Sequence, residues 1–191
     1  MIPREKDFGA VILAGGQSRR MGRCKALLTV DGQTLLARTA QQLTAFSELL
    51  LSANDPALAR QVPARLVRDN YPNGGPLAGL EAALTASRHE ALVCVPCDLP
   101  HLTAEVPRAL AARLPPEADA MVFVDRTGRV HPLCGVYRRR ILPVLRRQLE
   151  RRALRVTELL ECVQSVYLPA DGLVPDEVFH NLNTPEDLRK L

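Results

Sequence analysis

A glycine-rich, basic segment follows the first apolar run of the chain and has the residue types that bind anions. From Leu13 to Lys25 it reads LAGGQSRRMGRCK. Adjacent glycines let a ligand approach the main chain closely, and successive exposed N–H groups form an anion-binding concavity. Three arginines and one of only three lysines add positive charge. The segment predicts binding of a nucleoside triphosphate or similar ligand, with a basic surface loop as the alternative, because it matches neither common phosphate-loop pattern.

A carboxylate follows another apolar run, in the stretch CVPCDLP. Asp98 comes directly after this run. Mg²⁺ prefers one or two carboxylates together with phosphate oxygens and water, so Asp98 is the candidate metal ligand. The alternative is that Asp98 caps the next turn. The Cys94–Cys97 pair could suggest zinc or redox chemistry, but no second pair is present and no helix is expected at Cys97, so two core cysteines are preferred.

Polar residues also follow other expected strands. Asn54 and Asp69 could accept or donate hydrogen bonds to a base or ribose, although turn formation explains them equally well. The turn NGGPL (73–77) leads into a helix, whose N-terminus attracts polar or anionic groups. His131 could be a general base, but no serine or cysteine partner accompanies it. The segment NLNTPEDL (181–188) offers two asparagines before a helix start.

Apolar runs of strand length alternate with segments of helical period, which predicts a mostly parallel sheet covered on both faces. Ligands of such sheets lie beyond the carboxyl ends of the strands, where the polar stretches above are found. A turn at 125–129 indicates that an antiparallel strand follows. The expected strands are 10–13, 49–52, 65–67, 92–95, 120–124, 133–137 and 165–168. The expected helix faces carry Leu36, Leu43 and Phe46, then Leu77, Leu80 and Leu84, then Val106, Leu110 and Leu114, and in a helix over 138–150 Ile141, Leu142, Leu145 and Leu149.

Length and composition indicate one cytoplasmic globular domain over residues 1–191. The chain has 47% apolar and 24% charged residues, a net charge of +4, and no apolar run of membrane-spanning length. Five cysteines in apolar contexts fit free thiols in a reducing compartment. Arginines at 138–140, 146, 147, 151, 152 and 155 could touch RNA or an acidic partner. A solvated helix face is preferred, because no aromatic residue is interleaved for base stacking.

Taken together, these stretches resemble one family, the molybdenum cofactor guanylyltransferases. LAGGQSRRMGRCK is similar to the family signature L-A-G-G-x-S-x-R-M-G-x-D-K. RDNYPNGGPLAGL, PCDLP, HPLCGVY and NLNTPEDL resemble its later blocks, in the same order. The first block alone indicates only the wider Rossmann-like nucleotidyltransferase superfamily with its three-layer α/β/α fold. The resemblance covers about Gly9 to Leu188.

The resemblance implies transfer of GMP from GTP to molybdopterin, normally molybdenum-loaded, with release of pyrophosphate and with Mg²⁺ as cofactor. It suggests molybdoenzyme-maturation proteins as partners, and neither nucleic acid nor membrane. By motif, Arg20, Lys25 and Asp98 are the expected catalytic residues, with Asp98 also on the metal. The expected GTP contacts are Leu13, Ala14, Gly15, Gly16, Lys25, Asn54, Asp69 and Asp98. Asn181 and Asn183 are expected on the molybdopterin side.

One position departs from the family pattern, because Cys24 stands where the aspartate before the lysine is usual. If that aspartate orients the lysine or the metal, activity is impaired or compensated; if it only shapes the loop, nothing is lost. The alternatives are therefore a molybdopterin cytidylyltransferase, a nucleotidyltransferase for another phosphorylated acceptor, and a weakly catalytic nucleotide-binding protein that delivers cofactor. The double glycine favours guanine, since cytidylyl relatives tend to carry A-A-G.

Overall fold

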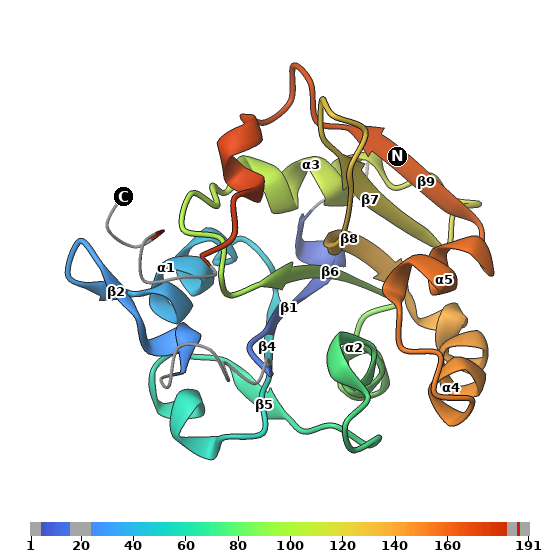
Figure 1. Ribbon diagram of the computed structural model, residues 1–191, viewed down its shortest axis with the longest axis horizontal. Helices are drawn as coiled ribbons and strands as arrows, with labels where there is room; N and C mark the ends of the chain where they lie inside the picture. The colour runs from blue at the N-terminus through green and yellow to red at the C-terminus, as the bar shows by residue number, and fades with distance from the viewer. Residues whose placement is uncertain (1–4, 16–23, 183–186, 188–191) are drawn as a thin grey trace.

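The computed structural model describes residues 5–15, 24–182 and 187 and shows a seven-stranded sheet in the order β5-β4-β1-β6-β8-β7-β9 (Figure 1). Parallel pairing joins β1 to β4 and β6, β4 to β5, and β7 to β9, whereas β8 runs antiparallel to both of its neighbours. The mostly parallel sheet and the antiparallel strand after the 125–129 turn are thus confirmed. The strands are β1 (Gly9–Leu13), β4 (Glu48–Ser52), β5 (Arg65–Val67), β6 (Ala91–Pro96), β7 (Ala120–Val124), β8 (Val130–Arg138) and β9 (Ser165–Pro169).

Helices cover both faces of the sheet and produce three layers, as expected. One face packs against α1 (Leu35–Gln42) and α3 (Glu105–Arg113), and the other against α2 (Gly75–Ala86), α4 (Leu142–Glu150) and α5 (Val156–Glu161) (Figure 1). Alternate residues of β1 enter the two cores, with Ile12 in the first and Val11 in the second. This division follows from the period of two in a strand that is buried on both sides.

Three expected helices are shorter than the sequence pattern indicated. The helix α3 ends at Arg113, so Leu114 is only its C-terminal cap. Leu43 is only the C-terminal cap of α1, and Phe46 is buried in the turn that follows. The helix expected over 138–150 begins at Leu142, after a 3-10 turn over Arg139–Ile141 (η4), and Arg138 still belongs to β8. Pro143 explains the late start, because proline lacks the N–H that a helix running through it would need.

The structure also contains elements that were not expected. A small hairpin pairs β2 (Thr29–Val30) with β3 (Gln33–Thr34) around Asp31 and Gly32, which have φ values of 49° and 77°. Positive φ at both central residues is the geometry of a type I′ turn, which Asp-Gly favours. Short 3-10 helices complete the chain: η1 (Glu5–Asp7), η2 (Lys25–Leu27), η3 (Pro56–Arg60) and η5 (Asp176–Phe179).

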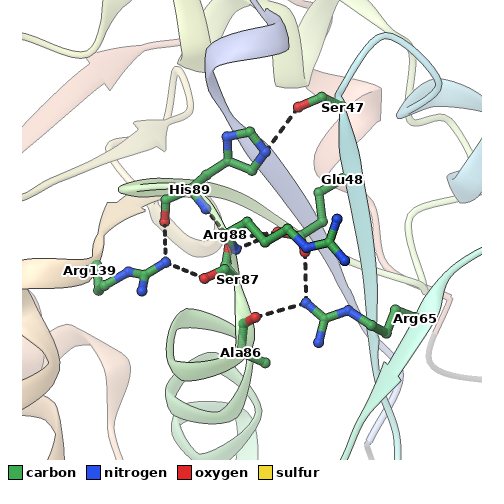
Figure 2. Close-up of polar contacts among 8 residues, drawn as sticks. All are labelled: Ser47, Glu48, Arg65, Ala86, Ser87, Arg88, His89 and Arg139. Atoms are coloured by element: carbon green, nitrogen blue, oxygen red, sulfur yellow. Dashed lines mark hydrogen bonds and ion pairs between the residues drawn. The ribbon is translucent and has the colours of Figure 1, made fainter.

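A polar cluster closes the edge of the sheet where the parallel strands begin (Figure 2). The carboxylate of Glu48 accepts hydrogen bonds from Arg65, from the Ser87 hydroxyl and from the main-chain N–H of Arg88, at 2.7–3.0 Å. These bonds hold the pKa of Glu48 below its usual value although burial acts the other way. The guanidinium of Arg139 donates to the carbonyl oxygens of Ser87 and His89.

The expectation that the arginines after β8 form only a solvated face is therefore wrong for several of them. Besides Arg139, Arg138 donates to the carbonyl oxygens of Pro115 and Ala118, and Arg140 pairs with Asp119. Arg146 bonds the buried carboxylate of Glu81 at 2.8 Å. These guanidinium groups tie the last strands and helices together.

Candidate functional site

A cavity of about 700 Å³ opens where the parallel strands end, on the edge of the sheet opposite the polar cluster of Figure 2. Its lining runs across the sheet, from residues after β4 and β5, through the ends of β1 and β6, to the start of β8. The strand β1 pairs with β4 on one side and with β6 on the other, so the connections that follow these strands diverge at the end of β1. The cavity therefore lies at the topological switch point of the sheet. Ligands of open α/β sheets bind at this place.

Lys25 and Asp98 face each other at the centre of the cavity. The Nζ atom of Lys25 lies 3.8 Å from Oδ2 of Asp98, and each side chain is about one-fifth exposed, at 22% and 20%. Burial raises the pKa of Asp98 above its usual value, and the Lys25 ammonium acts in the opposite direction. A partly buried carboxylate beside one cation is a group that a metal ion or a second cation would stabilise.

Lys25 is placed by η2, which begins directly after Cys24, and Asp98 follows β6. The N–H of Cys97 donates to the carbonyl of Leu13, which ties the end of β6 to the end of β1. The N–H of Leu182 donates to the carbonyl of Asp98 at 3.0 Å. This bond brings the segment that contains Asn181 to the same centre.

The half of the cavity beyond β4 and β5 is lined by groups that can recognise a base or a ribose. The Nδ2 group of Asn54 donates to Oδ2 of Asp69 at 3.1 Å. Desolvation raises the pKa of Asp69, and the bond from Asn54 acts against this shift. The N-terminus of α2 reaches the cavity through Gly75 and Pro76, and Gly75 has a φ of 61°, which suits glycine.

The opposite half of the cavity is shaped by an irregularity in the pairing of β7 with β8. Val122 pairs with Gly135, yet the next residue, Phe123, pairs with His131, so the residues 132–134 have no partner on β7. All of them line the cavity. The buried hydroxyl of Tyr137 donates to the carbonyl of Pro132 and fixes this bulge. Bulges beside functional sites re-aim side chains in this way.

His131 is held on this half by two contacts. Its Nε2 lies 2.8 Å from Oδ2 of Asp125, and its ring stacks on Phe179 with centroids 4.1 Å apart and an angle of 19°. The other oxygen of Asp125 accepts from the main-chain N–H groups of Thr127 and Arg129 and from the Thr127 hydroxyl. The bonds from Thr127, His131 and Arg129 hold the pKa of Asp125 far below its usual range.

Most residues expected at the site line this one cavity. They are Leu13, Ala14, Gly15, Lys25, Asn54, Asp69, Asp98 and Asn181. Arg20, Gly16, Asn183 and the helix start at Thr184–Pro185 lie outside the described residues.

Other lining residues were not expected. Ser52 and Asn73 were read as part of a strand and a turn, and the Phe179 ring gave no signal because its contact with His131 spans 48 positions of sequence. Cys24 also lines the cavity, beside Lys25.

The Cys94–Cys97 pair is not a reactive motif in this structure. Both cysteines are free and buried, and burial raises the pKa of Cys97 to about 12. Among the described residues, no group of three or more His, Cys, Asp or Glu side chains could hold a metal ion. The preference for core cysteines is confirmed. Among the same residues, no helix is both long and apolar enough to cross a membrane.

The three-layer fold with a cavity at the topological switch point defines the class of Rossmann-like α/β proteins, which bind ligands beyond the carboxyl ends of their strands. The solved structure of molybdopterin-guanine dinucleotide biosynthesis protein A from Archaeoglobus fulgidus superposes with a TM-score of 0.81 over 96% of each chain, at 24% identity. At 24% identity this match shows that the two proteins share a fold.

The family model described as "MobA-like NTP transferase domain" matches residues 10–164, and this chain belongs to that family. A molybdenum cofactor guanylyltransferase of Cereibacter sphaeroides is 39% identical over 96% of this chain and 94% of its own length. A protein of Carboxydothermus hydrogenoformans named "Probable molybdenum cofactor guanylyltransferase" is 37% identical over 97% of this chain and 95% of its own length.

Proposed function

We propose that the protein transfers GMP from GTP to the terminal phosphate of molybdopterin, normally molybdenum-loaded, and releases pyrophosphate. The observation that carries the proposal is the Lys25–Asp98 pair at the centre of a cavity that continues to both sides along the sheet. Such a cavity has room for a nucleotide on one side of the pair and an acceptor on the other. The similarity to named molybdenum cofactor guanylyltransferases supports the same reaction.

The chemistry asks for positioning and charge neutralisation. The acceptor phosphate is already an anionic nucleophile, so its attack on the α-phosphorus needs no strong general base. The barrier arises from repulsion between anions and from the charge that develops on the leaving pyrophosphate. Lys25 neutralises that charge from one wall of the cavity, and Arg20 is proposed to do so from the glycine-rich segment. Asn54, Asp69 and the α2 N-terminus orient the nucleoside.

Asp98 is the proposed ligand for Mg²⁺. The fit is reasonable because Mg²⁺ in nucleotide sites takes one or two carboxylates and completes its shell with phosphate oxygens and water. Asp98 supplies one partly exposed carboxylate on the cavity wall, and burial raises its pKa while the Lys25 ammonium acts in the opposite direction. When bound there, the ion would supply positive charge that stabilises the negative charge of the phosphates.

A second candidate function rests on Cys24. This residue lines the cavity beside Lys25, at a position where the family pattern has an aspartate. If the missing carboxylate is needed for turnover, the protein binds nucleotide or cofactor and delivers it, with molybdoenzyme-maturation proteins as partners.

The decisive experiment measures pyrophosphate release from each of the four nucleoside triphosphates with Mg²⁺ and molybdopterin, for the natural chain and for Cys24→Asp. Release with GTP alone from the natural chain is expected. Release with CTP would replace the guanylyltransferase by a cytidylyltransferase. Release from Cys24→Asp only would favour the delivery role, and no release from either protein would overturn the proposed function.

A further inference from the structure

We propose that His131 contacts the phosphate monoester of the acceptor and holds the proton that this group loses when it becomes the nucleophile. The inference rests on the proposed function, because it concerns the second substrate of that reaction. It is carried by the bond of His131 to Asp125, by the stacking on Phe179, and by the place of the ring on the cavity wall.

The hydrogen bond to Asp125 determines which ring nitrogen of His131 is left for a substrate. Asp125 is ionised, since its pKa lies far below its usual range, so its carboxylate can only accept. Nε2 of His131 must therefore carry a hydrogen and donate it across 2.8 Å. Nδ1 has no hydrogen-bond partner among the described residues. In the neutral ring this atom is an acceptor, and in the imidazolium it is a donor.

The ring is held rigidly enough to serve as a fixed contact. It packs parallel to Phe179 of η5, and the His131 and Asp125 side chains are only 12% and 13% exposed. Arg126, in the same turn as Asp125, pairs with Asp171, which precedes η5, and with Asp176, the first residue of η5. These pairs add surface contacts between the two segments that carry His131 and Phe179.

The position along the sheet assigns His131 to the acceptor. The residues suited to a base or ribose lie beyond β4 and β5, and the Lys25–Asp98 pair lies at β1 and β6. His131 lies on the far side of that pair, at the start of β8. A nucleotide whose phosphates meet Lys25 leaves this half to the other substrate, which carries a phosphate monoester.

In the proposed step a proton moves from the acceptor phosphate to His131. A phosphate monoester has a second pKa near 6, so near neutral pH it can arrive with one O–H. Its proton passes to Nδ1 of neutral His131, which gives an imidazolium bonded to Asp125 and a phosphate dianion. A dianion oxygen then attacks the α-phosphorus, and the P–O bond to pyrophosphate breaks. The diphosphate ester that forms has no use for the proton, and His131 returns it to water.

The test compares His131→Phe with the natural protein in steady-state kinetics in which GTP and molybdopterin are varied separately. Phenylalanine keeps an aromatic ring against Phe179 but cannot bond Asp125 or a phosphate. We expect kcat/KM for molybdopterin to fall by about 10- to 100-fold, the usual effect of losing a hydrogen bond to a charged group. The KM for GTP should stay within about twofold.

His180→Phe is the matched control. His180 is exposed, follows Phe179 directly, and does not line the cavity, so this variant should behave as the natural protein does. His131→Gln is the second variant, because its amide can still donate to Asp125 or to a phosphate oxygen. In His131→Gln the KM for molybdopterin should return part of the way toward the natural value, but kcat should stay below that of the natural protein.

The outcomes separate the two proposals. Unchanged kinetics with molybdopterin in His131→Phe would overturn the role of His131 while leaving the guanylyltransferase intact. Equal losses for both substrates would show a purely structural role and would also overturn it. Absence of turnover in the natural protein overturns the proposed function. In that case the role of His131 is tested by a ¹⁵N NMR spectrum of its imidazole. The Nδ1 resonance should shift when molybdopterin is added. A resonance that does not move contradicts the contact.

Discussion

Lys25 and Asp98 are two groups of opposite charge, each about one-fifth exposed and separated by 3.8 Å. An ion pair at this distance contributes little to the free energy of unfolding, because water still reaches both groups. Its importance lies in what each group offers a substrate: an ammonium for phosphate oxygens and a carboxylate for a metal ion. Removing either group changes the site more than it changes the fold.

Replacing Lys25 with alanine is therefore expected to leave the fold intact and to slow turnover. By analogy with the loss of one charge-stabilising donor, kcat should fall by about 10²–10³, or about 2.7–4 kcal/mol, and Asp98→Asn should have an effect of similar size. Pyrophosphate release under saturating GTP and molybdopterin measures both.

Lys6 provides the matched control, because it is an exposed lysine in η1 and lies outside the cavity. Lys6→Ala should retain full activity. If Lys25→Ala turned over within threefold of the natural protein, Lys25 would not neutralise the leaving group.

At the scale of elements, a buried carboxylate joins α2 to α4 and to the loop before α2. Glu81 is 1% exposed; it accepts from Asn70 and Thr85 at 2.8 and 3.0 Å and from Arg146 at 2.8 Å. Asn70 directly follows Asp69 of the cavity wall. The network thus connects the packing of two helices with the position of a candidate nucleoside contact.

Arg146→Ala should destabilise the protein by about 3 kcal/mol, because it leaves the buried charge of Glu81 without its cation, and partial exposure of Arg146 keeps the loss at the low end. Urea unfolding monitored by circular dichroism measures the change. Arg147, next in α4 and exposed, is the matched control, and its alanine variant should differ from the natural protein by less than about 0.5 kcal/mol. Equal stability of the two variants would contradict the structural role of the network.

The contact of α2 with β4 depends on a glycine. A Cβ atom at Gly79 would lie 2.4 Å from Oγ of Ser52 and 3.2 Å from a methyl group of Leu13. Gly79→Ala should cost about 1–3 kcal/mol of unfolding free energy through overpacking, in spite of the better helix propensity of alanine. Thermal unfolding is the measurement.

Adding Ser52→Gly removes the clashing hydroxyl and should restore most of the stability lost in Gly79→Ala. A double variant as unstable as the sum of the two single variants would show that the close approach to Ser52 is not the cause.

The strands were predictable from the sequence because they are buried on both faces and read as unbroken apolar runs. The β2–β3 hairpin was not, because its strands have two residues each and too few positions for an alternating pattern, although Asp31-Gly32 is a turn signal. The bulge at residues 132–134 depends on register with β7, and no local pattern contains it. The ion pair of Glu81 was not predicted, because its partner Arg146 lies 65 positions away in the sequence.

The candidate site was predictable where a polar residue lies within two positions of the end of a strand, as with Asp69 after β5 and Asp98 after β6. It was less predictable where two distant segments meet. His131 was noticed without a partner, because the partner is a turn aspartate six positions before it and the stacking ring is on η5. The single domain over 1–191 and the individual roles of the site residues stay predictions.

The five cysteines are all free and differ in how deeply the fold buries them. Cys94, Cys97 and Cys134 are buried in the two cores, and burial raises the pKa of Cys97 and Cys134 to about 12. Cys162 is exposed, and Cys24 is partly exposed on the cavity wall. A thiol reagent that attacks thiolates should distinguish these classes.

In the native protein, we expect Cys162 to react first with a disulfide reagent and Cys24 more slowly, with GTP protecting Cys24. Cys94 should react only at the rate of global unfolding, and Cys97 and Cys134, which are buried although they belong to the cavity lining, should react much more slowly than Cys24. Time-resolved labelling with mass spectrometry identifies each position. Rapid modification of Cys94, Cys97 or Cys134 in buffer would contradict the buried core.

The reversed direction of β8 has a consequence for how this architecture can diversify. Because β8 runs against its neighbours, its first residues, rather than its last, meet the cavity, and a tight turn over 125–129 joins them to β7. Insertions in that turn would extend the loop between β7 and β8 over one side of the cavity and would leave the register of every parallel strand unchanged. Descendants of one ancestor could exchange acceptors through this hairpin alone and inherit the phosphate-handling centre unchanged.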